Sequence, residues 1–525
     1  MGVVLVAEKI ADSGLALLRE GGHEVRVELS LSPEDLLLAL PGVNAIIIRS
    51  ATQVTAEVIA AGSALQVVGR AGIGLDNVDV AAATKKGVMV VNAPQSNILS
   101  AAEHALGLLI AQARNIPQAH AALVAGSWER SKWEGVELYG KTLGVVGLGH
   151  VGALVAQRAL AFGMKLVAYD PYITGERARR MGVELLASLE DLMARSDFVT
   201  IHLPKTKETM GLIGRDLLFK AKTGVRIVNA ARGGIIDEEA LAEAIEAGHV
   251  GGAGLDVYAS EPCTDSPLFG LPGVVATPHL GASTTEAQDK AGITIAEQVN
   301  LALAGELVPF AVNLAAGELP EAAKPFLPMA ETMGRIMASL HEGVPGSLKI
   351  AYQGALAGEG GGRPSVLKLS ALKGLFAAGT EEPVSYVNAP RLAEEKGLVI
   401  EEISSTSSKD YVSLLTLRSP GHSIAGTLAG ARSEPRIVML DDHSVEIPPA
   451  PNMLVVTNDD RPGMIGVVGT VLGDGGISIS SMAVGPSTAG PTALMVLSTE
   501  TPVENAVLAA LRASEGILEV HRVSS

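Results

Sequence analysis

The sequence has few aromatic residues and a single cysteine. Aromatic residues make up 3% of the 525 positions, so any packed core must be built from aliphatic side chains. Because Cys263 is the one cysteine, the chain cannot form an internal disulfide or a cysteine-based zinc site. A lone cysteine also fits a reducing compartment, and we expect a cytoplasmic protein.

Positive charge and long apolar runs are also scarce. Lys and Arg number 40 against 57 Asp and Glu, a formal charge of −17. This balance argues against nucleic acid or an anionic membrane as a partner, although it allows a local basic pocket. No stretch approaches 18 uncharged apolar residues, and the first residues lack the pattern of a secretory signal. We therefore expect no membrane span and no secretory signal.

The first 97 residues instead alternate short β-branched runs with helical patterns. Helices are expected at Ser32–Leu40 and Thr55–Ala61. Strands that alternate with helices predict βαβ units and a parallel sheet. The expected strands are Val3–Val6, Val25–Val27, Ala45–Ile48, Val67–Val68 and Val88–Val91.

The same rhythm restarts at Thr142 and continues to about Glu286. Before it, Ser100 and Glu103 have the spacing of a capping box, which predicts a helix from Ser100 to about Arg114. Asp237 and Gly248 carry start and stop signals for another helix.

The carboxyl-terminal part has a different sequence pattern. Residues 448–451, PPAP, are typical of a stiff linker. The segment from Met453 to Ser525 follows in the order strand, helix, strand, strand, helix, strand. That order predicts a ferredoxin-like unit.

A glycine motif points to a dinucleotide site. Leu143–Gly152 reads LGVVGLGHVG, in which Gly147, Gly149 and Gly152 form GxGxxG between an apolar strand and a helix. The glycines allow a tight turn and close approach of the pyrophosphate to a helix N-terminus. Asp170 ends the next strand, where its carboxylate would accept ribose hydroxyls and repel a 2′-phosphate. We therefore expect NAD rather than NADP.

Three later segments place reactive side chains at expected strand ends. NAARGG contains Arg232, GLDVYASEP contains Asp256 and Glu261, and TPHLGAST contains His279. In an open α/β sheet these ends border the ligand crevice.

These four motifs resemble those of the D-2-hydroxyacid dehydrogenase family, most closely its long, regulated D-3-phosphoglycerate dehydrogenases. The resemblance covers nearly the whole chain. It implies an α/β fold with a flavodoxin-like substrate-binding domain (1–97 and 287–314) and a Rossmann NAD-binding domain (98–286). An α+β intervening domain (315–449) and a ferredoxin-like ACT domain (450–525) would follow.

The resemblance also implies roles for individual residues. His279 would be the general base, because its pKa suits proton transfer near neutrality. Glu261 would orient His279 and stabilise its charged form, and Arg232 would hold the substrate carboxylate. The expected cofactor residues are Gly147, Gly149, His150, Val151, Gly152, Asp170, Leu203, Ala230 and Asp256.

Two arginines favour a phosphorylated substrate. Arg49 and Arg70 both end apolar runs of the first domain, and a small unphosphorylated acid would not need them. The resemblance implies that 3-phosphoglycerate is oxidised to 3-phosphohydroxypyruvate, the first step of phosphorylated serine synthesis. It also implies a substrate-binding loop of Gly72, Ile73 and Gly74. Arg130 and Lys132 would act across the interface of a homo-oligomer, a dimer or tetramer.

The ACT-like segment suggests control by an amino acid. Asn458 and Asp460 flank a turn whose helix N-terminus suits a carboxylate. Ser478 stands where many serine-binding relatives carry asparagine. Feedback inhibition by L-serine is the resulting hypothesis.

Two alternatives remain open at this point. One is a related dehydrogenase acting on glycerate or 2-hydroxyglutarate, and the other is a non-catalytic, NAD-sensing scaffold. No metal site is expected, because His104 and His202 lack a second ligand at suitable spacing, so we expect packing or hydrogen-bonding roles for both.

Overall fold

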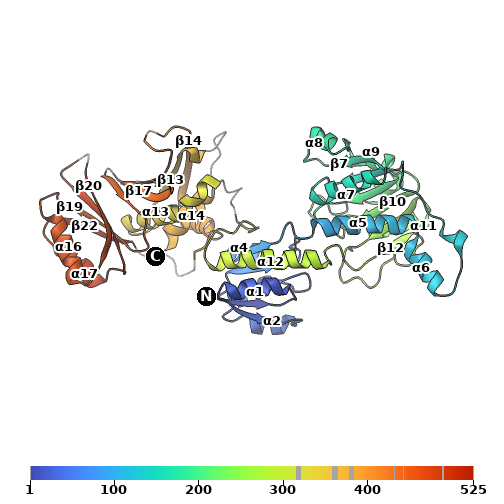
Figure 1. The fold of residues 1–525 in the computed structure, drawn as a ribbon, viewed down its shortest axis with the longest axis horizontal. Coiled ribbons are helices and arrows are strands. Elements are labelled where there is room, and N and C mark those ends of the chain that lie inside the picture. Colours follow the sequence, from blue (N-terminus) through green and yellow to red (C-terminus); the bar gives the residue numbers. More distant parts are fainter. Residues whose placement is uncertain are drawn as a thin grey trace.

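The chain forms four units arranged along one long axis, with the first unit between the second and the third (Figure 1). The structure is a computed structural model. It describes residues 2–314, 321–357, 365–377, 384–408, 410–430, 432–441, 443–487 and 490–523. The expected boundary at 314/315 adjoins residues 315–320, which lie outside this set.

The first unit is a parallel sheet in the order β2-β1-β3-β4-β5, which is the expected flavodoxin-like order. One face packs on α1 and α12 through Leu18, Ile295 and Val299, and the other packs on α2, α3 and α4. The strands are β1 (Val3–Val6), β2 (Glu24–Val27), β3 (Ala45–Ile48), β4 (Val67–Arg70) and β5 (Met89–Asn92). The helices are α1 (Asp12–Glu20), α2 (Pro33–Ala39), α3 (Ala56–Ala61), α4 (Val80–Lys86) and α12 (Thr285–Leu303).

The second unit is a seven-stranded parallel sheet in the order β12-β11-β10-β9-β6-β7-β8. Helices α5 and α7 cover one face, and α9, α10 and α11 cover the other. The strands are β6 (Thr142–Val146), β7 (Lys165–Tyr169), β8 (Glu184–Leu185), β9 (Phe198–Ile201), β10 (Val225–Asn229), β11 (Val250–Leu255) and β12 (Val274–Ala276). The helices are α5 (Ile98–Ala113), α6 (Ile116–Val124), η1 (Arg130–Trp133), α7 (His150–Ala161), α8 (Gly175–Arg180), α9 (Leu189–Arg195), α10 (Arg215–Lys220) and α11 (Glu238–Glu246).

The first residues of the helices show where the local sequence is enough to predict a helix start. Asp237 caps α11 as expected, accepting a hydrogen bond from the Ala240 N–H at 3.0 Å. The prediction for Ser100 was wrong, because α5 begins two residues earlier and Ser100 lies inside it. The Ser100 hydroxyl instead bonds the Thr284 hydroxyl at 2.8 Å. Asn97 is the N-cap of α5 and makes no side-chain capping hydrogen bond.

The third and fourth units share a core. The third has a mixed sheet in the order β14-β13-β15-β16-β17-β18, and the fourth has an antiparallel sheet in the order β20-β21-β19-β22. Met453, Val455 and Val523 of the fourth sheet join the apolar cluster around α13 and α14. The other face of the fourth unit's sheet packs on α16 and α17, which gives the expected ferredoxin-like arrangement.

The third unit contains η2 (Glu321–Phe326), α13 (Leu327–Leu340), β13 (Ser347–Gly354), η3 (Ala355–Ala357), α14 (Ser365–Ala377), α15 (Ala389–Glu395), β14 (Val399–Ser405), β15 (Ser413–Ser419), β16 (His422–Ala429), β17 (Glu434–Leu440) and β18 (His443–Ile447). The fourth contains β19 (Met453–Asn458), α16 (Met464–Asp474), β20 (Ile479–Pro486), β21 (Ala493–Thr499), α17 (Asn505–Ala513) and β22 (Ile517–Val523).

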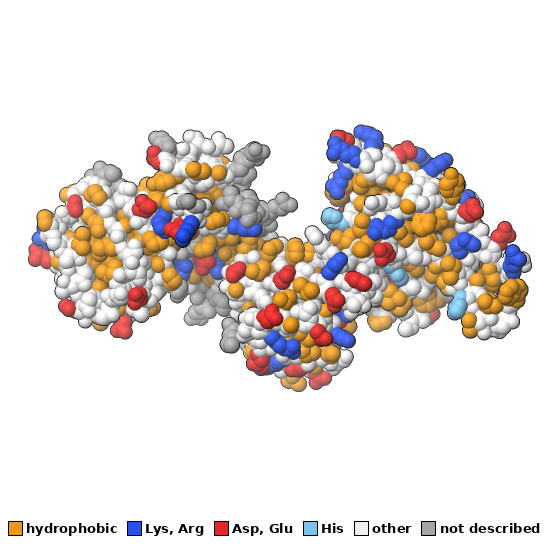
Figure 2. Space-filling model, viewed as in Figure 1, with side chains coloured by type: hydrophobic (Ala, Val, Ile, Leu, Met, Phe, Trp, Pro, Cys, Tyr) orange, Lys and Arg blue, Asp and Glu red, His pale blue; other side chains and the backbone are white. Residues whose placement is uncertain are grey.

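Charged side chains of both signs are interspersed over the face shown in Figure 2. No helix in the described ranges is both long enough and apolar enough to cross a membrane.

Candidate active site

The glycine turn after β6 is shaped for a close ligand. Gly147 has a φ of +90°, which favours glycine, and a Cβ there would lie 2.6 Å from the His202 carbonyl oxygen. A Cβ on Gly152 would lie 2.1 Å from the Gly147 oxygen, so α7 can pack this tightly only with glycine. Gly149, the N-cap of α7, has open space around its Cβ position. The helix N-terminus is therefore accessible to a pyrophosphate.

Asp170 lies beside this turn, directly after β7. Its Oδ2 accepts a hydrogen bond from the Leu148 N–H at 2.8 Å, and its Oδ1 accepts one from the Tyr172 N–H at 2.9 Å. Each carboxylate oxygen can accept a further bond, which leaves acceptors for ribose hydroxyls.

A cavity continues from the turn between the first two units. It is lined by six of the residues expected to bind the cofactor, together with Ile73 and Pro94 from the first unit. These six are Gly149, His150, Val151, Leu203, Ala230 and Asp256. Apolar walls with a few polar groups suit a nicotinamide ring and its ribose.

Asp256 is fully buried, and the protein's own donors occupy its carboxylate. The Leu280 and Gly281 N–H groups donate to it at 2.7 and 2.8 Å, and the Thr277 hydroxyl donates at 2.6 Å. Burial opposes ionisation, but these bonds and His104, 3.1 Å away, keep the pKa of Asp256 below its ordinary value. Asp256 therefore fixes the loop that carries His279. His104 also bonds Thr277, and His202 bonds Thr200, which agrees with the hydrogen-bonding role expected of both histidines.

His279 and Glu261 form a hydrogen-bonded pair. His279 Nδ1 lies 2.6 Å from Glu261 Oε2. The bond to this carboxylate raises the pKa of His279, although partial burial opposes the rise. Burial also opposes ionisation of Glu261, but bonds from His279 and the Tyr258 N–H lower its pKa. Since Nδ1 faces Glu261, Nε2 remains for a substrate.

Arg232 completes the expected catalytic group. Its Nε lies 3.3 Å from Asp76 Oδ2, in the first unit. Arg232 and His279 both line the cofactor cavity and a second, basic cavity, so they lie where the two meet. Gly74 is packed so closely that a Cβ would lie 2.4 Å from an Arg232 guanidinium nitrogen.

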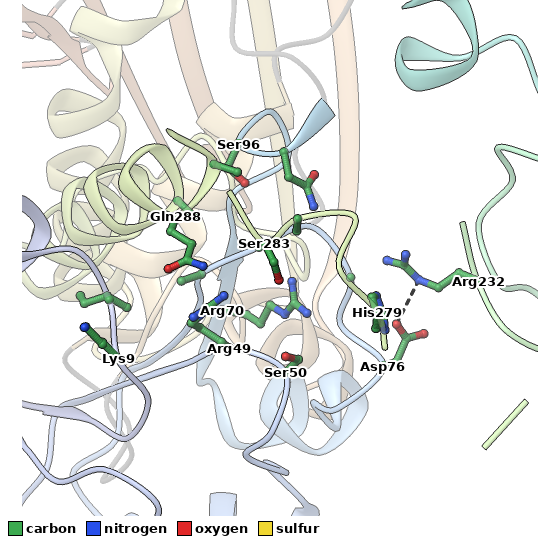
Figure 3. Close-up of a pocket in the computed structure, with 18 residues that line it drawn as sticks. Lys9, Arg49, Ser50, Arg70, Asp76, Ser96, Arg232, His279, Ser283 and Gln288 are labelled. Carbon is green, nitrogen blue, oxygen red and sulfur yellow. Dashed lines mark ion pairs between the residues drawn. The ribbon is translucent and has the colours of Figure 1, made fainter. Parts of the chain in front are cut away.

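The basic cavity contains both expected phosphate ligands. Arg49 and Arg70 project into it from the ends of β3 and β4, and Lys9 projects into it from the loop after β1 (Figure 3). Burial lowers the pKa of Arg70 to about 10, helped by the charge of Arg232, so Arg70 remains a cation at neutral pH. Gly72 and Gly74 line the same cavity. Lys9 was not among the residues expected from the sequence, because it lies three residues after β1, whereas Arg49 directly follows β3.

The loop that carries Arg49 is held from both sides. The Glu8 carboxylate accepts N–H groups from Arg49 at 2.9 Å and from Thr52 at 2.8 Å. It also accepts the Ala51 N–H at 3.1 Å. Asn77 Nδ2 donates to the Arg49 and Thr52 carbonyl oxygens at 2.8 and 2.6 Å. Neither residue was among those expected from the sequence.

Other expected residues are not brought to this site within one chain. Arg130 and Lys132 lie on η1 and line neither cavity, and Lys132 instead bonds Glu129 at 3.2 Å.

Of the effector residues, Asn458 lies at the end of β19 that pairs with Ala493. Ser478 precedes Ile479, which pairs with the opposite end of β21 at Thr499. Asn458 Nδ2 already donates to the Ala493 carbonyl oxygen at 3.1 Å. Within the described ranges, no group of three or more His, Cys, Asp or Glu side chains is placed to hold a metal ion.

Comparison with known proteins places this geometry in context. Residues 106–281 match the NAD binding domain of D-isomer specific 2-hydroxyacid dehydrogenases. Residues 322–441 match the D-3-phosphoglycerate dehydrogenase intervening domain, and 452–516 match the ACT domain.

Similar proteins extend this match over the whole chain. The D-3-phosphoglycerate dehydrogenase of Mycobacterium bovis is 49% identical over 519 residues, covering 98% of this chain and 97% of that protein. The Mycobacterium leprae enzyme is 48% identical over 533 residues, covering 99% of each. Among solved structures, the NAD-dependent formate dehydrogenase of Staphylococcus aureus in complex with NAD is 32% identical with a TM-score of 0.53. That alignment covers 58% of this chain and 97% of that one.

Proposed function

The chain belongs to the D-3-phosphoglycerate dehydrogenases of the D-isomer specific 2-hydroxyacid dehydrogenase family, and we propose from this that it oxidises 3-phospho-D-glycerate to 3-phosphohydroxypyruvate. The product is the 2-keto acid that begins phosphorylated L-serine synthesis. The observation that carries the proposal is the position of Arg232 and His279, which line both the basic cavity and the cofactor cavity.

His279 performs the proton transfer in this proposal. When bound, NAD supplies the acceptor for the hydride that leaves C2 of the substrate. His279 Nε2 takes the proton of the C2 hydroxyl as the C–O double bond forms, so two electrons leave with the hydride and the proton stays on the protein. Glu261 holds Nδ1 at 2.6 Å and stabilises the imidazolium that results.

Other residues of the chain orient the substrate. The Arg232 guanidinium, 3.3 Å from Asp76, presents a planar fork to the substrate carboxylate. The backbone of Gly72, Ile73 and Gly74 borders the same carboxylate. Arg49 and Arg70, with Lys9 beside them, bind the phosphate at the far end of the basic cavity.

The glycine turn, Asp170 and the apolar wall bind NAD in this proposal. Gly147 and Gly152 allow the close turn, and the open N-terminus at Gly149 meets the pyrophosphate. Asp170 accepts the ribose hydroxyls. His150, Val151, Leu203 and Ala230 border the bound cofactor, with Asp256 behind the nicotinamide end of the cavity.

Substrate selection gives the direct test. NADH formation is followed with 3-phosphoglycerate, D-glycerate and 2-hydroxyglutarate, with the product trapped at alkaline pH. We expect a strong preference for 3-phosphoglycerate that Arg70→Ala abolishes and Arg19→Ala, an exposed arginine on α1, preserves. Activity on an unphosphorylated acid alone would contradict the substrate, and no turnover on any of them would favour a scaffold.

Oligomerisation and location are further parts of the proposal. Helix α6 has no buried residue; Val124 at its end is 74% exposed and Trp128 after it is 82% exposed, which supports a homo-oligomer, dimeric or tetrameric, covering this surface. Arg130 and Lys132 of the partner subunit would then approach the substrate. The single cysteine supports a cytoplasmic location.

Serine is the proposed effector of the ACT domain. Since Asn458 and Asp460 lie at the opposite end of the sheet from Ser478, an effector site that uses all three requires two ACT domains. A serine titration of activity and binding tests this, and full activity with no binding at millimolar serine would contradict it.

A further inference from the structure

An acidic residue, Asp76, is part of the basic cavity. Among the described residues that line this cavity it has the only acidic side chain, and its carboxylate repels an anionic substrate. The cations of the same lining are Lys9, Arg49, Arg70 and Arg232. Because Asp76 opposes binding of the substrate, we expect it to have another role in the site.

The first unit fixes Asp76 within the loop that follows β4. On one side of Asp76, Asn92 Nδ2 donates to the Ile73 carbonyl oxygen at 2.7 Å. On the other side, the buried Asn77 donates to the Arg49 carbonyl oxygen at 2.8 Å. Asp76 is therefore held in place by the first unit, and its side chain points towards the second unit (Figure 3).

Arg232 meets Asp76 from the second unit. Its Nε lies 3.3 Å from Asp76 Oδ2, the ion pair drawn as a dashed line in Figure 3. Its Nη1 donates to the Ala231 carbonyl oxygen at 2.7 Å. Its Nη2 lies against Gly74, where a Cβ would be 2.4 Å away. Asp76 and Ala231 thus leave Nη2 for a substrate carboxylate that borders the Gly74 backbone.

Asp76 also offsets the repulsion between two arginines of the cavity. Burial and the charge of Arg232 lower the pKa of Arg70, and the charge of Asp76 opposes this fall. Without Asp76, the Arg232 guanidinium would lose its Nε partner and would still be repelled by Arg70. Both effects would move the guanidinium away from its present orientation.

We propose that Asp76 is a positioning residue for Arg232, holding Nε so that Nη2 meets the substrate carboxylate. This inference rests on the proposed function, in which Arg232 binds that carboxylate. Since the carboxylate is bonded to C2, the orientation of Arg232 also sets where C2 lies relative to His279 and the cofactor. Asp76 therefore raises kcat, although its charge also raises KM.

Asp76→Asn and Asp76→Ala separate these two effects. Both substitutions remove the charge, but asparagine keeps an oxygen that can accept from Nε. In Asp76→Asn, KM for 3-phosphoglycerate should fall, a gain that misfolding cannot produce, and kcat should stay within about twofold of the parent chain. In Asp76→Ala, kcat should lie about five- to tenfold below that of Asp76→Asn, the scale of a partly exposed hydrogen bond to a charged group. Glu57→Gln, on the exposed start of α3, is the control and should match the parent chain.

A double-mutant cycle tests whether Asp76 acts through Arg232. Lysine has no planar fork for Asp76 to orient. In an Arg232→Lys background, Asp76→Ala should therefore change kcat/KM by a smaller factor than in the parent chain. An equal factor in the two backgrounds, or an equal kcat in Asp76→Asn and Asp76→Ala, would overturn the proposal.

The parent chain shows separately whether the proposed function holds. The acids 3-phosphoglycerate, D-glycerate and 2-hydroxyglutarate all carry the carboxylate that Arg232 binds, so the variants are assayed on whichever acid the parent chain oxidises. Oxidation of an unphosphorylated acid alone would contradict the substrate, and the comparison of the Asp76 variants would still decide the role of Asp76. No turnover of any acid would contradict the proposed function and this role together.

Discussion

His279 Nδ1 and Glu261 Oε2 lie 2.6 Å apart, and this bond sets the charge and orientation of the imidazole. The carboxylate raises the pKa of His279. During oxidation of the hydroxy acid His279 must begin neutral, so the rate rises with pH as the imidazole loses its proton. In the reverse reaction it must begin protonated, and the raised pKa favours that direction near neutrality.

Glu261→Gln should therefore move the acidic limb of the oxidation rate to lower pH. Without the carboxylate the pKa of His279 falls, so the imidazole is neutral over a wider range. For His279→Ala we expect kcat to fall by roughly 10²- to 10⁴-fold, which is typical of removing a general base. The maximal kcat of Glu261→Gln should also fall, but by less than this. The measurement is kcat against pH, with Glu184→Gln, at an exposed pair with Arg195, as control. An unmoved acidic limb would contradict the role given to Glu261.

Arg49→Ala and Lys9→Ala should raise KM for 3-phosphoglycerate to different extents, because the two side chains differ in burial. Arg49 is half-buried, and its loss should raise KM for 3-phosphoglycerate by about 10- to 100-fold, the range for hydrogen bonds to a charged group. Lys9 is exposed, so its loss should raise KM by at most about fivefold. Steady-state kinetics at fixed NAD measures both, with Arg19→Ala as control. A fall in kcat at constant KM would show that these residues do not bind the ground-state substrate.

The sheets and the strand-end residues could be predicted because their signals are local. Ala45–Ile48 is fully buried and extended, as its β-branched run indicates. Arg49 and Arg70 lie at strand ends, and topology alone brings them to one edge of the sheet. The glycine turn could be predicted from the GxGxxG spacing of its glycines. The parallel sheets and ferredoxin-like unit predicted from these signals are confirmed.

The features that could not be predicted from the sequence depend on contacts between segments that are far apart in the chain. Asp76 meets Arg232, and His104 meets Asp256, across more than 150 residues with no shared pattern. The Ser100 prediction failed because α5 begins two residues earlier, and the Ser100 hydroxyl bonds the distant Thr284. Glu8 was missed because a carboxylate that binds three backbone N–H groups has no sequence motif.

Asp170→Asn should weaken the preference for NAD over NADP. The substitution keeps one acceptor oxygen but removes the negative charge that repels a 2′-phosphate. KM for NAD should rise by about tenfold, the scale of one charged hydrogen bond, and KM for NADP should fall. Kinetics with both cofactors tests this, with Asp191→Asn, on the exposed start of α9, as control. An unchanged ratio of kcat/KM for the two cofactors would exclude Asp170 as the determinant.

Glu8→Gln should destabilise the protein at neutral pH and loosen the Arg49 loop. Burial opposes ionisation of Glu8, but the N–H groups of Thr52, Arg49 and Ala51 lower its pKa. A carboxylate with a lowered folded pKa contributes stability above its unfolded pKa of about 4.3, and this contribution disappears as pH falls through the folded value. We expect a loss of about 1 kcal/mol at pH 7, as for partly exposed charged hydrogen bonds, which vanishes in acid. KM for 3-phosphoglycerate should rise with little change in kcat, because Arg49 binds substrate without taking part in proton transfer. Thermal unfolding from pH 7 downward, with Glu28→Gln as exposed control, tests the first effect. A difference in melting temperature that persists at the lowest pH would mean that Glu8 acts by packing, not by its charge.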